Sequence, residues 1–454
     1  MKTFAIFSFV AILALLILAV GVVNPPAAEA VPSYARQTGL ACSGCHYAPP
    51  ELNPAGRRFK LLGYVDRADD TKTVHSDPAK KHAALDLLAS LPLSAMLETS
   101  YTQTKKAVPE TQNGTLEFPQ DVSLFLSGAW TSHVGSFIQV TYDTQDDHFT
   151  MDNSDVRYAN LKKLSSGKEF IYGLDINNNP GVEDLWNNTP AWGFPWLADD
   201  FAPTPNASPI INGNLGQDAV GFGGYAMYDN HLYVDAALYR SGHIGVGQPN
   251  PGVGLTYNIR GAAPYWRIAW QQSGAKTQFE VGTYGMHMRS TPNGITGAED
   301  TYTDYAFDTQ LDQTIRRTDV LSLRATFIRE NSDLTATAAM LQSPIVTHHL
   351  GTILANAEYH FGNRFTTTLG WFNTSGTADG ALYPVTGDLA GNFNGDPKSN
   401  GYIFSASYWP WQNLQLGAQY TAYTRFNGAG TNYDGNGRNA SDNNTFFLVA
   451  RFLF

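Results

Sequence analysis

Cysteine is almost absent from this chain. Only two cysteines occur in 454 residues, and they lie three positions apart, at Cys42 and Cys45. A small secreted disulfide scaffold would carry more cysteines at scattered spacings, so that class of protein is excluded. A structural zinc site is disfavoured as well, because it usually needs a second ligand pair at similar spacing.

Charge and long apolar runs are also scarce. Charged residues make up 15% of the chain, and its net charge is −11. An acidic surface repels phosphates, so we expect no nucleic-acid partner. After residue 23 there is no run of about eighteen apolar residues, which argues against a later transmembrane helix. Glycine (42 residues) and aromatic residues (13%) are abundant instead, and together with the strand patterns below they indicate a mostly β protein.

The first thirty residues have the form of a secretory signal peptide. Lys2 gives a positive start, residues 4–23 are apolar, and Ala28-Glu29-Ala30 is a small-x-small cleavage sequence. The apolar stretch is long enough to serve as an uncleaved anchor, which is the alternative. No cationic stop-transfer cluster follows it, so we expect cleavage after Ala30 and export of the chain.

The two cysteines belong to a Cys-x-x-Cys-His sequence at residues 42–46. In a c-type haem site the two thiols add to the vinyl groups and the adjacent histidine binds the iron. A redox dithiol is the alternative, but it needs a surrounding βαβ pattern and leaves the histidine unexplained. We therefore expect one covalently attached haem c, with Cys42 and Cys45 as attachment points and His46 as proximal iron ligand.

Short helices are expected around this motif. Asn53 followed by Pro54 is a typical helix start, and Gly63 is suited to end that helix. A second amphipathic helix is expected over residues 79–91, opened by Asp77-Pro78. The cytochrome segment, residues 31–91, is small enough that the haem would have to supply much of its core.

The sixth iron ligand is left open by the sequence. His75 and His82 lie inside the segment and Met96 just beyond it, and an open position is a further alternative. His82 is the best placed of the three, one turn before Leu85 on the expected helix. The neighbouring Arg57 and Arg58 suit pairing with haem propionates, unless they are simply solvated.

From residue 92 onward the chain alternates apolar and polar residues over long runs. The last strand places Phe446, Leu448, Ala450, Phe452 and Phe454 on one face. Another places Asn356, Glu358 and His360 opposite Ala355, Ala357, Tyr359 and Phe361. Runs of about ten residues suit tilted transmembrane strands better than a soluble sandwich. We therefore expect a transmembrane β-barrel over residues 92–454.

Short turns and long loops alternate along this region, as they must when a barrel has a periplasmic and an outer end. Short turns are expected at residues 228–231, 272–275 and 361–364. Long exposed loops are expected at residues 177–217, 242–262, 376–400 and 427–444. Seventeen strands would break the alternation, and assigning residues 334–341 to an outer loop gives about sixteen antiparallel strands. The glycines of residues 221–224 lie within a strand pattern, where they allow close packing at the wall.

Acidic pairs in the loops are candidates for gathering cations at the outer mouth. They are Asp146-Asp147 beside His148, Asp199-Asp200 and Glu299-Asp300. Carboxylate and imidazole suit Fe(II), although such pairs are usually only solvated.

Two stretches carry a family resemblance. Residues 35–46 (Ala-Arg-Gln-Thr-Gly-Leu-Ala-Cys-Ser-Gly-Cys-His) and 50–64 (Pro-Glu-Leu-Asn-Pro-Ala-Gly-Arg-Arg-Phe-Lys-Leu-Leu-Gly-Tyr) precede a barrel directly. This arrangement resembles the fused outer-membrane monohaem cytochrome c–porin family associated with extracellular Fe(II) oxidation. The resemblance implies Cys42, Cys45 and His46 as haem ligands, and it matches the barrel by pattern only.

The combination predicts an electron-transfer conduit in the cell outer membrane. A sixteen-stranded barrel is wide enough to hold the cytochrome segment as a plug. Its haem would oxidise extracellular Fe(II), or another metal donor, by one electron and pass the electron to a periplasmic c-type cytochrome. The alternatives are an outward conduit that reduces extracellular metal or mineral acceptors, a passive porin with a structural haem segment, and a soluble periplasmic β protein.

Overall fold

The structure is a computed structural model of the whole chain. It describes residues 32–65, 73–74, 87–88, 91–144, 148–188, 191–242, 257–292, 296–386 and 389–454. The expected signal peptide, His75 and His82 lie outside the described residues. Among the helices that are described, none is long and apolar enough to cross a membrane.

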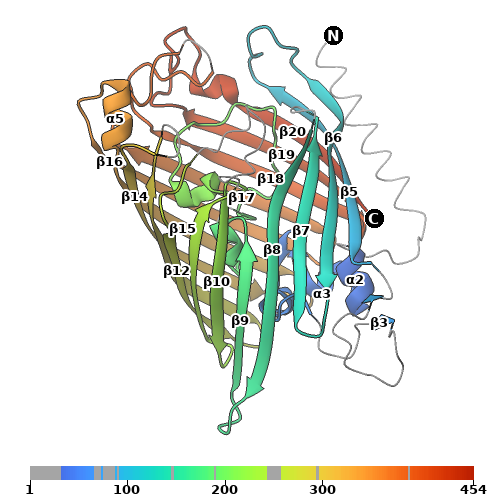
Figure 1. The fold of residues 1–454 in the computed structure, drawn as a ribbon. Coiled ribbons are helices and arrows are strands. Elements are labelled where there is room, and N and C mark those ends of the chain that lie inside the picture. Colours follow the sequence, from blue (N-terminus) through green and yellow to red (C-terminus); the bar gives the residue numbers. More distant parts are fainter. Residues whose placement is uncertain are drawn as a thin grey trace, which may run out of the picture.

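Sixteen antiparallel strands of the described chain close into one barrel, in which the last strand, β20, pairs with the first, β5 (Figure 1). The strands are Leu93–Thr104 (β5), Thr115–Ala129 (β6), Val134–Asp143 (β7), His148–Lys163 (β8), Glu169–Asn177 (β9), Ala219–Tyr228 (β10), Leu232–Ser241 (β11), Ala263–Ser273 (β12), Thr277–Ser290 (β13), Asp300–Thr314 (β14), Val320–Asp333 (β15), Thr347–Phe361 (β16), Phe365–Gly376 (β17), Ser399–Trp411 (β18), Leu414–Arg425 (β19) and Thr445–Leu453 (β20). The expected strand number is confirmed. The helix Thr335–Leu341 (α5) lies in the loop between β15 and β16, where the sequence placed an outer loop.

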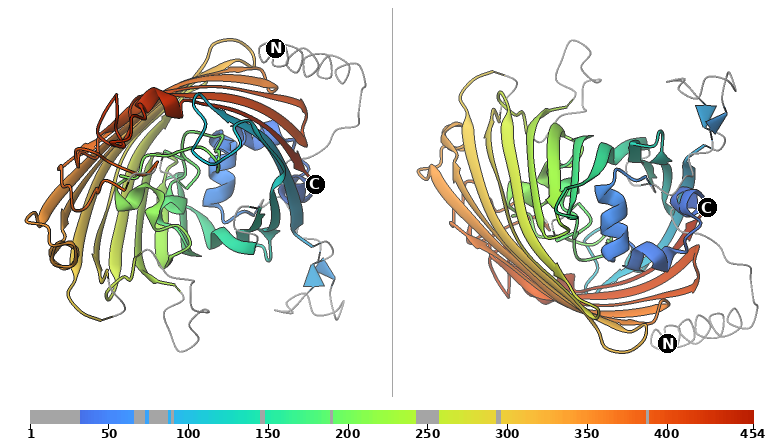
Figure 2. Two further views of the ribbon diagram at one scale, coloured as in Figure 1. Left: turned by 90° about the horizontal axis from the view of Figure 1, so that it is seen from above. Right: turned by 90° about the horizontal axis from the view of Figure 1, so that it is seen from below.

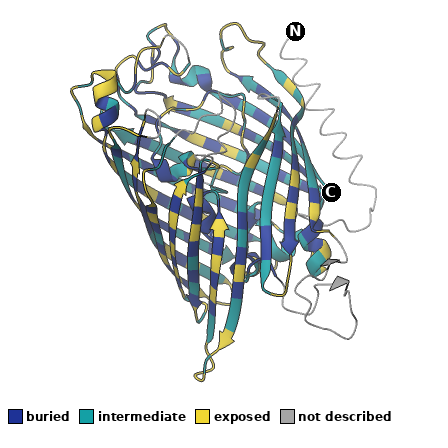
Figure 3. Cartoon of the chain, viewed as in Figure 1, coloured by how far each residue is buried: buried dark blue, intermediate teal, exposed yellow. Residues whose placement is uncertain are grey.

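The wall alternates as the sequence predicted. On β16, Asn356, Glu358 and His360 are buried on the inner side, whereas Ala357 and Tyr359 are partly exposed between them. Exposed and buried residues alternate along the strands (Figure 3). Large apolar side chains are among those exposed on the outer face. They include Leu126, Leu174, Phe222, Leu238, Ile268, Phe307, Leu369 and Phe404. An apolar outer belt on a closed barrel is the mark of an outer-membrane protein, so the predicted fold class and location are confirmed.

The short turns define one end of the barrel. They join β10 to β11, β12 to β13 and β16 to β17 at the three expected places. Aromatic rings gather near these turns: the Phe361 ring lies 4.5 Å from Tyr359 and 5.6 Å from Phe365, and the rings of Trp270 and Phe279 are 6.4 Å apart. Short turns are typical of the periplasmic end, and aromatic rings are typical of either membrane interface, so this end is assigned to the periplasm by its turns.

One long loop does not lie outside the barrel, contrary to expectation. The described parts of the loop between β9 and β10, residues 178–188 and 191–218, turn inward through the short helices Pro180–Glu183 (η1) and Ile210–Asn214 (η2). Val182, Trp186 and Leu197 of this loop are at most 2% exposed. Its asparagines and prolines suggested an exposed connection. Burial of its apolar side chains is favourable, however, and the lumen is where they are buried.

The N-terminal segment enters the barrel, and Figure 2 shows two of its helices within the ring of strands and the first one at the edge of the ring. It comprises the helices Pro32–Thr38 (α2), Cys42–Cys45 (α3) and Pro54–Leu61 (α4), and the short strands His46–Ala48 (β1) and Glu51–Leu52 (β2). It contacts the short-turn end: Cys42 N lies 3.2 Å from Gln412 Oε1 in the β18–β19 turn, and Ala129 N donates to Gln37 at the end of β6.

Of the two helices predicted near the motif, the first is confirmed and the second is not. Asn53 accepts hydrogen bonds from Ala55 N and Gly56 N, so it caps α4 as expected, and Gly63 follows the helix with φ of +73°. The helix expected over residues 79–91 is wrong where it is described, because Leu87–Leu88 (β4) pairs with Thr73–Val74 (β3). A short apolar run suits either kind of element, so its spacing did not decide between them.

Candidate functional site

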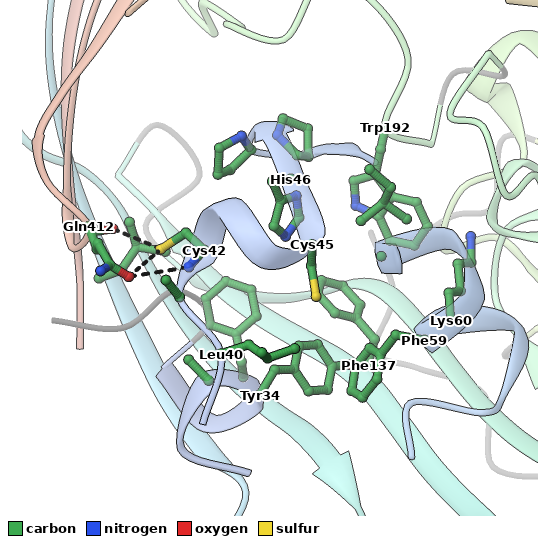
Figure 4. A pocket seen from close by; sticks show the side chains of 18 of the residues that line it. Tyr34, Leu40, Cys42, Cys45, His46, Phe59, Lys60, Phe137, Trp192 and Gln412 are labelled. Carbon is green, nitrogen blue, oxygen red and sulfur yellow. Dashed lines mark hydrogen bonds between the residues drawn. The ribbon is translucent and has the colours of Figure 1, made fainter. Parts of the chain in front are cut away.

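A cavity lies between the N-terminal segment and the inner wall, and Cys42, Cys45 and His46 all line it (Figure 4). Atoms leave about 1470 Å³ unfilled there, part of which is open to solvent. The structure thus brings the three residues of the sequence motif together at one cavity inside the barrel.

His46 is held in one orientation by its neighbour in the segment. Its Nδ1 lies 3.2 Å from the backbone carbonyl oxygen of Glu51. Because a carbonyl only accepts, the neutral ring carries its proton on Nδ1 and keeps the Nε2 lone pair for a metal. Burial lowers the pKa of His46, and the carbonyls of Glu51 and Pro50 oppose this only in part. A neutral imidazole is the form that binds iron.

The short helix α3 that carries both cysteines packs closely on α4. Asn53 Nδ2 donates to the carbonyl oxygens of Ser43 and Gly44, at 3.2 and 3.1 Å. A Cβ on Gly56 would lie 2.2 Å from the carbonyl oxygen of Cys45, so only glycine permits this contact. No disulfide joins Cys42 to Cys45.

The rest of the cavity is largely aromatic and aliphatic. Tyr34 and Phe59 approach edge to face at 5.1 Å, and Phe137 and Trp192 do so at 5.3 Å. Leu40, Leu52, Trp196, Trp409 and Leu453 complete most of the apolar lining. Trp192 and Trp196 come from the inward loop 178–218, which therefore reaches the cavity from the opposite end of the barrel. Two thiols, one neutral imidazole and flat apolar walls fit a covalently attached haem.

Met96 is the one alternative distal ligand that the structure describes. It lines the cavity from β5, whose other inward residues, such as Ser94, Glu98 and Ser100, are polar and buried. A thioether among polar lumen residues is unexpected for a barrel wall. His82, which the sequence favoured, and His75 lie outside the described residues.

The two arginines expected near haem propionates have other contacts. Arg57 is buried, donates to the Leu52 carbonyl at 2.8 Å and lies 3.6 Å from Asp312. Arg58 pairs with Glu169 at 2.9 Å on a partly exposed surface. Both guanidinium groups are therefore bound to the protein, and Arg57 is not solvated.

Lys60 is a cavity residue that the sequence reading missed. Its Nζ donates to the carbonyl oxygens of Val182 and Asp184, at 2.5 and 2.8 Å, and lies 4.7 Å from the Trp192 ring centre. Burial and the neighbouring Arg157 lower the pKa of Lys60 to about 7. Its position on α4, one turn from Arg57, does not predict a cavity residue, because its hydrogen-bond partners come from a loop distant in the sequence.

A buried ion cluster attaches the segment to the wall behind His46. Glu51 pairs with Arg324 of β15, which also binds Glu358 at 2.5 Å, and Glu51 Oε2 lies 3.4 Å from His360. Burial alone would raise the pKa of Glu51, but Arg324 and His360 outweigh it and lower the value to about 2. Trp196, which lines the cavity, donates to Glu358 at 2.7 Å.

The acidic pairs suggested as cation collectors serve local structure where they are described. Asp300 accepts from Ala336 N and Thr337 N and so caps α5. Glu299 pairs with Arg260 and Arg289, each at 3.2 Å. Asp199 accepts from the backbone of its own turn, Asp200 accepts from Gln120, and Asp146-Asp147 lies outside the described residues.

Comparisons with solved structures return outer-membrane proteins. OmpF of Salmonella typhi is 10% identical with a TM-score of 0.47, covering 80% of this chain and 97% of that one. The channel DcaP of Acinetobacter baumannii is 10% identical with a TM-score of 0.45, and the match covers 80% of this chain and 96% of that one. A loop-deletion mutant of OmpT from Vibrio cholerae is 11% identical with a TM-score of 0.44, and the match covers 80% of this chain and 99% of that one. No family model and no curated protein sequence matches the chain. These similarities carry no information about the cavity.

Proposed function

We propose that this protein is a haem-containing outer-membrane conduit that passes single electrons between an extracellular metal donor and a periplasmic c-type cytochrome. The observation that carries the proposal is the convergence of Cys42, Cys45 and His46 on one apolar cavity inside a closed membrane barrel. A thiol pair and a neutral histidine at such a place suit haem c better than a redox dithiol, which needs neither the histidine nor the apolar walls.

The filling of the lumen favours this function over a passive porin. Residues 32–65 and the described residues of the inward loop both lie inside the barrel and touch each other, as Asn187 Nδ2 donates to the Pro50 carbonyl at 3.2 Å. Buried ion pairs attach both segments to the wall, since Glu51 binds Arg324 and Glu183 binds Arg157. A diffusion porin of this size leaves an aqueous channel in its lumen.

The residues of the cavity would each have a definite task. Bound haem supplies a one-electron couple. Cys42 and Cys45 would hold it covalently, and His46 would bind the iron through Nε2 while the Glu51 carbonyl fixes the ring. Trp192, Trp196 and Phe137 would keep water from the macrocycle. Met96 would supply a further iron ligand, because it is the thioether that lines the cavity.

The position of the cavity and the charge of the lumen suggest the direction. The cavity lies at the short-turn end, so a periplasmic cytochrome would have the shorter approach. Among the described residues, buried acidic side chains outnumber buried basic ones, which favours a cationic donor. Fe(II) would give up one electron, leave as Fe(III), and reduce the site by that one electron.

The reduction potential of the site and a direct titration with Fe(II) distinguish the proposed function from that of an outward conduit. We expect anaerobic Fe(II) to reduce the detergent-solubilised holoprotein, read from its visible spectrum. Reduction by dithionite but not by Fe(II) would contradict the assignment of the donor and favour an outward conduit. Absence of any haem spectrum would contradict the proposal as a whole.

A further inference from the structure

Three carboxylates converge inside the barrel at a place that the proposed function does not use. Asp175 lies on β9, Glu183 on η1 and Asp235 on β11, and they are 2%, 0% and 5% exposed. One oxygen of each lies within 4.8 Å of the others.

The strand between β9 and β11 makes room for this approach. Gly223 of β10 pairs with Asp175 on one side and Ala237 on the other. A Cβ on Gly223 would lie 2.8 Å from Asp175 Oδ1 and 2.8 Å from Ala237 Cβ. Glycine therefore leaves room for the Asp175 carboxylate to lie over β10. Asp235, which pairs with Tyr225 two positions along β10, and Glu183 of the inward loop approach it there.

Three oxygens of the two aspartates lack a hydrogen-bond donor, whereas Asp235 Oδ2 accepts a hydrogen bond from Tyr233 OH at 3.4 Å. Both oxygens of Asp175 and Oδ1 of Asp235 are buried and accept no hydrogen bond from any described residue. Glu183, in contrast, is oriented by Asn177 Nδ2 at 2.5 Å and by Tyr239 OH at 3.3 Å. A buried ionised carboxylate without partners is strongly destabilising, so these oxygens require a ligand or a proton.

The charges nearby do not balance. Arg157 pairs with Glu183 at 3.0 Å and with Asp155 at 2.6 Å. Arg157 and the neighbouring Lys60 are therefore two cations beside four carboxylates, those of Asp155, Asp175, Glu183 and Asp235. The excess of negative charge lies where the orphan oxygens are, because Arg157 forms no ion pair with Asp175 or Asp235 among the described contacts.

We infer that Asp175, Glu183 and Asp235 form a binding site for one divalent cation. The ligand set consists of oxygen only, which selects hard cations such as Ca²⁺, Mg²⁺ and Mn²⁺ and also accepts Fe(II). Oxygens that bind Ca²⁺ at 2.3–2.6 Å lie at most about 5 Å apart, which matches the observed spacing.

The site adjoins the haem-binding segment without sharing its ligands. Glu183 lies between Val182 and Asp184, whose carbonyls bind Lys60 of α4. A cation there would hold the inward loop to β9 and β11 and so support α4 through Lys60. The inference does not depend on electron transfer, since it concerns occupancy of the carboxylate cluster alone.

The test is metal binding by the full-length holoprotein in detergent, after chelation and dialysis. Ca²⁺, Mg²⁺, Mn²⁺ and Fe(II) are added separately under anaerobic conditions with the haem fully reduced, so that Fe(II) transfers no electron. Bound metal is counted by elemental analysis, and Mn²⁺ also by electron paramagnetic resonance. We expect one tightly held cation per chain with at least one of the four metals.

The matched variants are Asp175→Asn with Asp235→Asn, and Asp304→Asn as control. Asp304 is an equally buried wall carboxylate, outside the cluster, that accepts from Ile211 N at 2.9 Å. We expect the double variant to bind the preferred cation at least about tenfold more weakly and the control to bind normally. Absence of stoichiometric binding by the unaltered protein, or equal binding by a folded double variant, would overturn the inference. The first of these outcomes does not depend on the folding of any variant.

Discussion

His46 and Glu51 link the cavity to the barrel wall in a single step. The backbone carbonyl of Glu51 lies 3.2 Å from His46 Nδ1, and its side chain pairs with Arg324 of β15. The same residue therefore orients the expected iron ligand and anchors the segment that carries it. Loss of the anchor and loss of haem ligation are accordingly expected to be coupled.

Replacing Glu51 by Gln tests this coupling. The change leaves Arg324 buried with one carboxylate partner fewer, and removing one partner of a buried pair costs about 3–5 kcal/mol. We expect urea unfolding of the barrel in lipid vesicles to become easier by this order, with a measurable change in the haem spectrum. Glu169→Gln removes the partly exposed partner of Arg58 and should cost less than about 1 kcal/mol. Equal effects of the two changes would contradict an anchoring role.

Replacing either cysteine tests covalent attachment. In Cys42→Ser or Cys45→Ser one thioether is missing, and with both changed the haem should separate from the polypeptide on a denaturing gel. Peroxidase staining of the protein band reports this directly. Ser43→Ala keeps the spacing of the motif and should keep full staining. A stained band in the double variant would refute the assignment of these residues.

Replacing Met96 tests the distal ligand. In Met96→Ala the charge-transfer band of a sulfur–iron bond should vanish and the reduction potential should fall, because a methionine ligand raises the potential. Leu97→Ala, which alters the neighbouring residue on β5, should leave both unchanged. If His82→Ala removes six-coordinate iron and Met96→Ala does not, the ligand is the histidine favoured by the sequence.

Replacing Gly56 by Ala tests the packing of α3 on α4. The added Cβ would lie 2.2 Å from the Cys45 carbonyl, so the two helices must separate. Overpacking of this kind costs about 1–3 kcal/mol, and we expect less haem per chain at normal barrel yield. Gly44→Ala adds the same methyl group 3.3 Å from the flexible Leu40 side chain and serves as control. Full haem content in Gly56→Ala would show that this contact is dispensable.

Local patterns explain why much of this structure could be predicted. Alternation with period two identifies each strand without knowledge of its partners, and it predicted the inward placement of Glu358 and His360. The alternation of short turns and long loops then reduced seventeen candidate strands to the sixteen observed. The cap at Asn53 likewise depends on residues two and three positions away. The Cys-x-x-Cys-His spacing placed three residues at one cavity because they share one short turn of chain.

The contacts that complete the site are not local. Glu51 and Arg324 are 273 positions apart, and Lys60 finds its carbonyl partners more than 120 positions away. The inward course of residues 178–218 follows from burial of Trp186 and Leu197 in a lumen that exists only once the barrel closes. Composition of the loop alone could not reveal this, and so Trp192 and Trp196 were missed as cavity residues.

The central claim is that the haem site passes electrons through a plugged barrel. The direct measurement uses lipid vesicles that carry the holoprotein and enclose oxidised c-type cytochrome, with Fe(II) added outside. We expect the enclosed cytochrome to be reduced by one electron for each Fe(II) oxidised, without leakage of a small encapsulated dye. Vesicles with the Cys42→Ser, Cys45→Ser variant should show no such reduction. Reduction at the same rate in that variant, or none in the unaltered protein, would contradict the claim.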